Sequence, residues 1–303
     1  MTSATPPPYA DRDSRDRRSA RASRRNLLAA GGAAALVVAG AGAGAGNTAA
    51  QPSDARSQAD RQRRTATYVL VHGGAHGGWC YQRVARILRS AGHKVYTPTL
   101  TGLGERAHLV GPAVDLDLQI QDVTQGLRYE DLNDAILVGH SYGGLVITGA
   151  ADRAIDRVGH LVYLDSITPY NGESLADIAP ELMAAARANG RVVDGVELVL
   201  FPGTEPIPNY GVTDPEDIAW LQSKLTPHPY KCFDQKLRLE HEEQLWRIPQ
   251  SQIVCTSTLP YRDPERMKLA QAAGRVWDID TGHDLMITEP RKVADLLLRL
   301  ASV

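Results

Sequence analysis

The feature that most constrains this chain is residues 135–151, where an apolar run leads into a glycine-rich turn and then into a second apolar run. The first run, 135–138, is typical of a buried strand, and the second, 145–151, is typical of a buried helix. In the turn, 139–143, Ser141 has a glycine two residues before it and another two residues after it. Glycines at these places allow a sharp strand-to-helix turn with the serine at its apex. The stretch predicts a nucleophile elbow, and the alternative is an ordinary glycine-rich turn.

Strand-like and helix-like patterns alternate from residue 65 to the end of the chain. Strands are expected at 67–72, 94–98, 135–138, 161–164, 251–256 and 275–279, with helical patterns between them. Residues 168–247 contain no strong strand run and are rich in Ala, Glu and Leu, which predicts a mostly helical lid insertion. Strands that alternate with helices form a mostly parallel sheet with helices on both faces. We therefore expect an α/β fold with a six-stranded sheet.

Residues that could take part in catalysis follow several of these strands directly. His72-Gly-Gly74 ends the first strand, Ser141 the third, Asp165 the fourth and His283 the last. The carboxyl ends of parallel strands share one edge of the sheet, where ligands bind. These residues are therefore expected to meet at that edge, although they are spread over two hundred residues of sequence.

A serine hydroxyl becomes a useful nucleophile only when a base removes its proton during attack. His283 fits this role best because it lies in a loop opened by glycine after the last strand. His72 and His76 are expected to shape the first glycine-rich loop. His140 is adjacent to Ser141, and because neighbouring elbow residues point apart, packing is its expected task.

The histidine needs a carboxylate to orient its ring and stabilise its charged form. Asp165 stands directly at the end of the fourth strand and is the favoured candidate. The fifth strand is the common source of this acid, but 255–260 offers no carboxylate. Asp263, a few residues later, remains the alternative.

Negative charge that develops on a carbonyl oxygen needs preorganised donors. The backbone N–H groups of Tyr142 and Gly74 are the candidates for this oxyanion hole. Further residues are candidates for the substrate pocket, and for those within 168–247 the core of the insertion is an equal alternative. They are Gly73, His76, Trp79, Met183 and Trp220, with Phe201, Tyr210 and Trp246 as additional aromatic walls.

The front of the chain differs in composition from the rest. Residues 1–50 carry seven arginines and three aspartates, for a net charge of +4, and contain Arg24-Arg25 ahead of a mildly apolar Ala/Gly/Val run. A basic segment, an apolar segment and a small-residue exit predict an export signal of the twin-arginine type and a secreted protein. A retained membrane anchor is the weaker alternative because the run has few strong hydrophobes. The polar segment 51–64 is expected to be a flexible linker, and the folded domain 65–303 follows it.

Other classes of function find little support in the sequence. The three cysteines, Cys80, Cys232 and Cys255, form no framework, and buried free thiols are the default, with a single disulfide as the alternative. No Cys/His spacing indicates a metal site, and no cofactor is expected. The mixed charges of the segment 51–64 indicate no nucleic-acid role.

With the elbow, the loop His72-Gly-Gly-Ala-His-Gly77 and the late Gly282-His283 in place, the chain resembles the α/β-hydrolase superfamily. Within it, the chain is similar to the plant methylesterase and hydroxynitrile lyase group and its bacterial esterase relatives. The resemblance implies Ser141 as nucleophile, His283 as base, and the N–H groups of Gly74 and Tyr142 as oxyanion hole.

The chain departs from that group in two places. The plant relatives carry their acid after the fifth strand, where this chain has Ser257-Thr258. The lyases need a lysine directly after the histidine, whereas Asp284 stands here and would repel cyanide. The expected function is hydrolysis of a small carboxylic ester or lactone. The alternatives are a cofactor-free lyase or C–C hydrolase, or a slow-turnover ligand-binding protein.

Overall fold

A computed structural model describes residues 65–204 and 208–301. The predicted export signal at 1–50 and the linker at 51–64 lie outside the described residues, so both stay predictions. None of the helices in the described ranges combines the length and the apolar character that a bilayer crossing requires.

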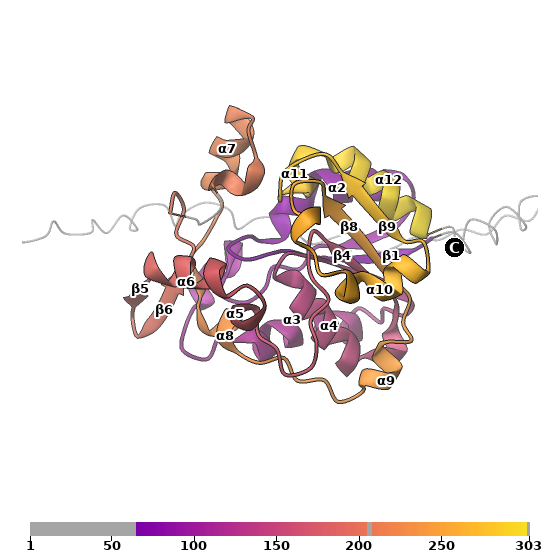
Figure 1. The fold of residues 1–303 in the computed structure, drawn as a ribbon, viewed down its shortest axis with the longest axis horizontal. Coiled ribbons are helices and arrows are strands. Elements are labelled where there is room, and N and C mark those ends of the chain that lie inside the picture. Colours follow the sequence, from indigo (N-terminus) through magenta and orange to yellow (C-terminus); the bar gives the residue numbers. More distant parts are fainter. Residues whose placement is uncertain (1–64, 205–207, 302–303) are drawn as a thin grey trace, which may run out of the picture. The chain divides into compact units, whose positions relative to one another are not determined.

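A six-stranded sheet in which every pairing is parallel forms the centre of the described structure (Figure 1). Its spatial order is β2-β1-β3-β4-β8-β9. The strands are β1 (Thr67–Val71), β2 (Lys94–Tyr96), β3 (Ala135–His140), β4 (Val158–Leu164), β8 (Gln250–Cys255) and β9 (Val276–Ile279). The predicted α/β fold and its six strands are confirmed, with boundaries that differ by a few residues.

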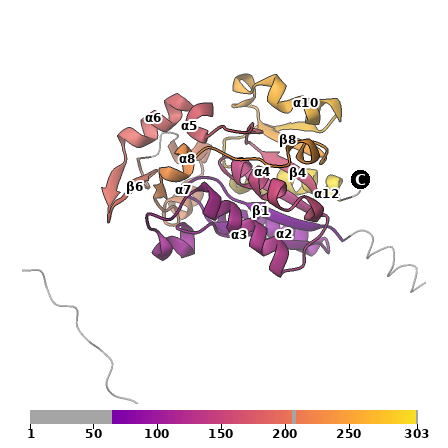
Figure 2. The same ribbon diagram turned by 90° about the horizontal axis from the view of Figure 1, so that it is seen from below.

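Helices cover both faces of this sheet (Figures 1 and 2). One face carries α2 (Gln82–Ser90) and α12 (Pro290–Leu300), and the other carries α3 (Leu116–Tyr129) and α4 (Gly143–Arg153). The strand β1 shows why both faces bury apolar side chains. Tyr68 and Leu70 enter the core beneath α2 and α12, whereas Val69 and Val71 enter the core beneath α3 and α4. Successive strand residues point to opposite faces, so a strand between two helical layers is apolar throughout.

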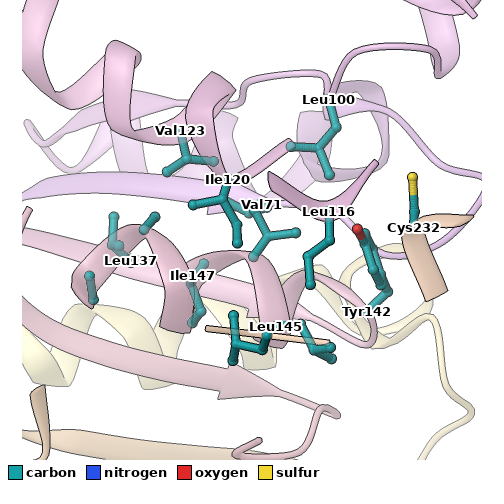
Figure 3. Close-up of a cluster of buried hydrophobic side chains, with 14 of the residues drawn as sticks. Val71, Leu100, Leu116, Ile120, Val123, Leu137, Tyr142, Leu145, Ile147 and Cys232 are labelled. Carbon is teal, nitrogen blue, oxygen red and sulfur yellow. The ribbon is translucent and has the colours of Figure 1, made fainter. Parts of the chain in front are cut away.

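The core on the α3–α4 side supports the elbow directly (Figure 3). Leu145 and Ile147 of α4 pack there with Ile120 of α3, and all three are fully buried. The ring of Tyr142 is buried in the same core. The residue after Ser141 therefore anchors the elbow to the helical layer.

The direction of the chain through the sheet changes between β1 and β3. From β1 the chain passes outward to β2, and it then returns across β1 to β3 and continues through β4. Val71 at the end of β1 pairs with Gly139 of β3. Such a reversal point leaves a crevice beyond the carboxyl ends of the two strands. The first glycine loop and the elbow both border it.

The glycines of the elbow are required by close contacts between backbone segments. A Cβ on Gly139 would lie 2.5 Å from the Gly143 carbonyl oxygen, and one on Gly143 would lie 2.7 Å from the His72 carbonyl oxygen. Ser141 itself has φ of 51°, in the left-handed region that few side chains adopt. The predicted sharp strand-to-helix turn is present with Ser141 at its apex, and the role of Ser141 as a nucleophile stays a prediction.

The insertion at 168–247 is helical only in part. Its helices are α5 (Leu175–Ile178), α6 (Pro180–Ala188), α7 (Pro215–Gln222), α8 (Lys231–Asp234) and α9 (Glu242–Leu245). It also contains a three-stranded antiparallel sheet of β5 (Arg191–Val193), β6 (Val196–Val199) and β7 (His228–Pro229), which the prediction missed. Asp194 and Gly195 join β5 to β6 with positive φ at both residues. An Asp-Gly pair between short Val-rich runs is a hairpin signal that the overall composition concealed.

Candidate active site

A cavity of about 450 Å³ lies at the predicted edge of the sheet. Ser141, Asp165 and His283 all line it, from the ends of β3, β4 and β9. The insertion contributes the opposite, apolar wall. That wall includes Leu175, Ile178, Leu182, Met183 and Ala186. The cavity therefore places a hydroxyl, an imidazole and a carboxylate against a mostly apolar space.

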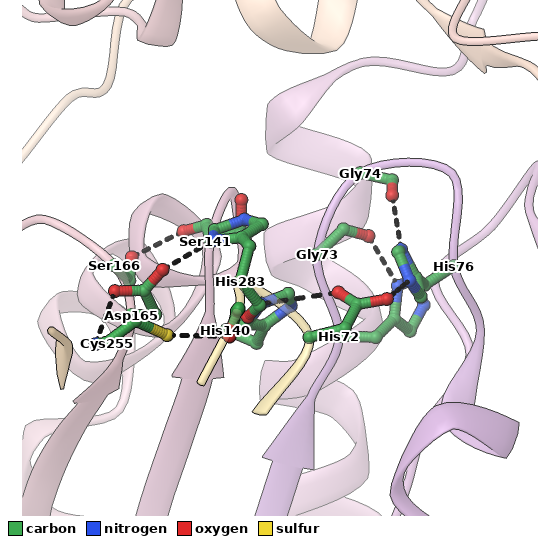
Figure 4. A network of polar contacts seen from close by, with 12 residues as sticks. His72, Gly73, Gly74, His76, His140, Ser141, Asp165, Ser166, Cys255 and His283 are labelled. Atoms are coloured by element: carbon green, nitrogen blue, oxygen red, sulfur yellow. Dashed lines mark hydrogen bonds and ion pairs between the residues drawn. The ribbon is translucent and has the colours of Figure 1, made fainter. Parts of the chain in front are cut away.

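His283 contacts a carboxylate through one ring nitrogen (Figure 4). Its Nδ1 lies 2.5 Å from Oδ2 of Asp165, and the Asp165 side chain is completely buried. An N–H at Nδ1 that donates to this oxygen leaves Nε2 as the nitrogen without a proton. The ring lines the cavity together with Ser141.

The second oxygen of Asp165 accepts three hydrogen bonds. Its donors are the Cys255 N–H at 3.0 Å, the Thr258 hydroxyl at 2.5 Å and the Arg262 Nη2 at 2.7 Å. Burial by itself would raise the pKa of Asp165, but the hydrogen bond and charge of His283, with smaller contributions from Arg262 and Thr258, hold that pKa well below its usual range. The carboxylate is therefore ionised throughout the neutral range.

The alternative acid, Asp263, lies elsewhere. Its carboxylate accepts from the Glu265 N–H at 2.9 Å and caps α10 (Pro264–Ala272). The side chain is half exposed and forms no contact with His283 among the described hydrogen bonds and ion pairs. Of the two candidates, the structure therefore brings only Asp165 to the imidazole.

The two candidate oxyanion donors both border the cavity. Gly74 and Tyr142 line it on either side of Ser141. Within residues 65–204 and 208–301, neither N–H donates to a protein acceptor in the turn and loop hydrogen bonds. Tyr142 is the N-terminal flanking residue of α4, so its N–H also benefits from the positive end of that helix.

Two histidines hold the first glycine loop, as predicted. Nδ1 of His72 lies 2.8 Å from the Gly73 carbonyl oxygen, and its Nε2 accepts from the Leu100 N–H at 3.0 Å. Nδ1 of His76 donates to the Gly74 carbonyl oxygen at 2.6 Å. These bonds fix the carbonyls of the loop and so orient the Gly74 region toward the cavity.

His140 connects the elbow to the histidine loop. Its Nε2 donates to the His283 carbonyl oxygen at 2.9 Å, and the two rings lie 4.6 Å apart. Burial, with the nearby His283, lowers the pKa of His140 to about 3. The ring is neutral at ordinary pH, and it positions the backbone of His283.

A second carboxylate, that of Asp284, lies behind the site. Its side chain is fully buried, and Oδ2 lies 2.9 Å from Nε2 of His76. Because Nδ1 of His76 also faces an acceptor, both nitrogens donate when the ring is an imidazolium. Burial favours the neutral acid, but the charges of His76 and of nearby histidines lower the pKa of Asp284. Asp284 does not line the cavity, and the expected repulsion of an anion by its charge stays a prediction.

The predicted pocket walls are right in part. Met183, His76 and Tyr210 line the cavity. The others that the sequence suggested do not line it: Gly73, Trp79, Phe201, Trp220 and Trp246.

Each of these side chains or backbone positions has another neighbour. Trp79 and Trp220 pack edge to face with ring centroids 5.1 Å apart, and Trp220 also faces the Arg83 guanidinium. The backbone of Gly73 packs against the elbow, since a Cβ there would lie 3.0 Å from Cβ of Ser141. Phe201 lies beneath the Arg191 guanidinium at 3.7 Å. Aromatic pairing and cation–π contacts thus hold Trp79, Trp220 and Phe201 away from the cavity.

The cysteine prediction is confirmed. Cys80, Cys232 and Cys255 are free and buried. Within the described part of the chain, no group of three or more His, Cys, Asp or Glu side chains is arranged to hold a metal ion.

Comparisons with known proteins agree with this fold. A family model described as "Alpha/beta hydrolase family" matches residues 68–296. A carbendazim hydrolyzing esterase from Nocardioides sp. (strain SG-4G) is 36% identical over 245 residues, covering 78% of this chain and 99% of the relative. Methylesterase 2 from Arabidopsis thaliana is 25% identical over 267 residues, covering 79% and 97%. An extracellular alpha/beta-hydrolase from a Paenibacillus species superposes with a TM-score of 0.60 at 25% identity, covering 77% of this chain and 98% of that one.

Proposed function

This chain belongs to the alpha/beta hydrolase family as an esterase-type member, and we propose that it is a secreted serine hydrolase that cleaves small carboxylic esters or lactones. Ser141 is the nucleophile, His283 the general base and Asp165 the acid that orients it. The observation that carries this proposal is the Asp165–His283 contact of 2.5 Å in a cavity that Ser141 also lines.

In the first half-reaction, the Ser141 oxygen attacks the ester carbonyl carbon while its proton passes to Nε2 of His283. The N–H groups of Gly74 and Tyr142 stabilise the negative oxygen of the tetrahedral intermediate. One such donor lowers a barrier of this kind by about 3 kcal/mol. The carbon–oxygen bond to the alcohol then breaks, and His283 returns the proton to the departing oxygen. An acyl group remains on Ser141.

In the second half-reaction, His283 removes a proton from water as the water oxygen attacks the acyl carbonyl. The bond to the Ser141 oxygen breaks, and the serine regains its proton from the imidazolium. Asp165 remains ionised throughout and stabilises the imidazolium in both steps. A carboxylic acid leaves, so the cycle needs no cofactor.

The cavity indicates the kind of ester. Its volume of about 450 Å³ lies in the range of small-molecule sites. The wall from α5 and α6 is aliphatic and includes Ile178, Leu182 and Met183. A substrate with one apolar group of moderate size would bury that group here. The names of the methylesterase and carbendazim-hydrolysing relatives support small esters and related carbonyl compounds as substrates.

Labelling with a fluorophosphonate probe tests the nucleophile. The Ser141 oxygen displaces fluoride from phosphorus, His283 takes the hydroxyl proton, and a stable phosphonyl-serine forms. The wild-type protein is expected to be labelled and to hydrolyse p-nitrophenyl acetate, whereas Ser141→Ala does neither. Equal labelling of both proteins would refute the proposed function.

Export is a separate part of the proposal. It is supported by Arg24-Arg25 ahead of an apolar run within residues 1–50. Replacement of both arginines by lysine should keep the protein inside the cell. Unchanged export of that variant would contradict the twin-arginine route.

A further inference from the structure

A cation lies directly against the buried carboxylate of the site. Nη2 of Arg262 is 2.7 Å from Oδ1 of Asp165, and the arginine side chain is only 13% exposed. Arg262 follows the short 3-10 helix η5 (Leu259–Tyr261) in the loop after β8. The proposed relay of hydroxyl, imidazole and carboxylate does not itself need this cation. A guanidinium brought this close to the acid therefore needs an explanation.

The two oxygens of Asp165 have separate tasks. Oδ2 faces His283, whereas Oδ1 accepts from Arg262, from Thr258 and from the Cys255 N–H. All three donors to Oδ1 come from the end of β8 and the loop after it, and not from β4, which carries the aspartate. With one oxygen held by three donors, the carboxylate cannot rotate away from the imidazole.

The charge of Arg262 also acts on the imidazole. In a buried site, a carboxylate stabilises the imidazolium form of its histidine partner, and a cation on the far side of the carboxylate opposes that effect. Arg262 therefore makes it easier for His283 to lose its proton.

Few other groups can set the charge of His283. His140 is neutral, since burial lowers its pKa to about 3, and Cys255 is a neutral thiol, since burial raises its pKa far above its usual range. Tyr210 faces the imidazole with its ring, at 6.3 Å between centroids. The buried Asp284, which is paired with the His76 ring, also interacts with His283 through its charge, and it is unchanged in the variants below.

We propose that Arg262 is a positioning residue that locks the Asp165 carboxylate and offsets its charge, so that removal of this cation changes the pH dependence of the reaction at Ser141. The inference rests on the proposed role of Ser141 as nucleophile. It concerns the pH range of the reaction and not the chemistry of the acyl transfer.

The rate constant of fluorophosphonate labelling between pH 5 and pH 9 tests this proposal without a known substrate. The acidic limb of the profile is the range in which the rate constant falls as the pH is lowered. In Arg262→Gln, this limb is expected to move to higher pH by about one unit, which is the effect expected from loss of one charge in a partly screened site. Arg262→Lys, which keeps the charge, should return most of the profile to its wild-type position. Arg266→Gln is the matched control, because Arg266 is 16% exposed, lies one helical turn further on and pairs with Glu173. Its acidic limb should coincide with that of the wild type.

The outcomes separate the inference from the proposed function. An acidic limb in Arg262→Gln that coincides with the wild type, or an equal shift in Arg266→Gln, would overturn the inference alone. If the glutamine variant does not melt cooperatively, Arg262→Met, which keeps the apolar stem, is judged by the same shift. Failure of both variants to fold would show a structural role and also overturn it. A wild-type protein that is not labelled at any pH would refute the proposed function and the inference with it.

Discussion

Replacement of Asp165 by asparagine gives the sharpest test of the site, because the structure determines how the new amide must lie. The oxygen at Oδ1 accepts three hydrogen bonds, from Cys255, Thr258 and Arg262. An NH2 group cannot accept them, so the amide oxygen must stay at this place and the nitrogen must face His283. Nδ1 of His283 then becomes an acceptor, and its proton moves to Nε2. That tautomer cannot take a proton from Ser141.

The expected loss in kcat for Asp165→Asn is about 10³- to 10⁴-fold, by analogy with the same change in other Ser-His-Asp enzymes. This corresponds to about 4–5.5 kcal/mol of transition-state stabilisation. The assay is hydrolysis of p-nitrophenyl acetate, with thermal melting to verify folding.

Asp263→Asn is the matched control, because asparagine caps a helix as well as aspartate does. Its kcat should remain within about twofold of the wild-type value, as expected for a residue that caps α10 and lies 3.7 Å from Arg266 Nε, away from His283. If Asp165→Asn kept more than about a tenth of the wild-type kcat, or if both variants were equally and mildly affected, the acid would be misassigned.

Two further predictions concern stability. Asp284→Asn removes the charge that faces the buried His76 ring, and it should lower the free energy of unfolding by about 3–5 kcal/mol in urea titrations; an unchanged midpoint would show that the pair carries no charge. Acid should destabilise the protein well above pH 4, because burial lowers the pKa of His72 and of His140 from 6.5 to about 3. Between about pH 3 and pH 6.5, the unfolded chain binds more protons than the folded chain. The free energy of unfolding is therefore highest above about pH 6.5, and it falls toward pH 3 by up to about 1.4 kcal/mol per pH unit for each histidine. Urea midpoints that stay constant from pH 7 to pH 4 would contradict this.

The predictions that failed concern features whose local sequence signal is weak or absent. The β5–β6 hairpin has a local signal in Asp194-Gly195, which the helix-rich composition of its surroundings outweighed. Trp79 and Trp220 have no such signal. They are more than a hundred residues apart, and their contact with each other, which removes both from the cavity wall, depends on the packing of α7 against the domain.

The residues around Asp165 also show that contacts between distant residues cannot be predicted from local sequence. The loop after β8 offers no carboxylate, and the sequence therefore left Asp165 and Asp263 as rival acids. In the folded chain that loop holds Asp165 through Thr258 and Arg262. Neither residue is part of a recognisable motif.

The sequence by itself determined the backbone of this site. Gly139 and Gly143 can surround Ser141 only in a sharp turn, and the alternation of apolar strands and helices brings the ends of β3, β4 and β9 to one edge. These are local steric and periodic constraints, which neighbouring residues impose on one another. Only the tertiary structure decided which carboxylate reaches His283 and which cation accompanies it. Those pairings depend on side chains about a hundred residues apart, and only the packing of β4 against β8 brings them within hydrogen-bond distance.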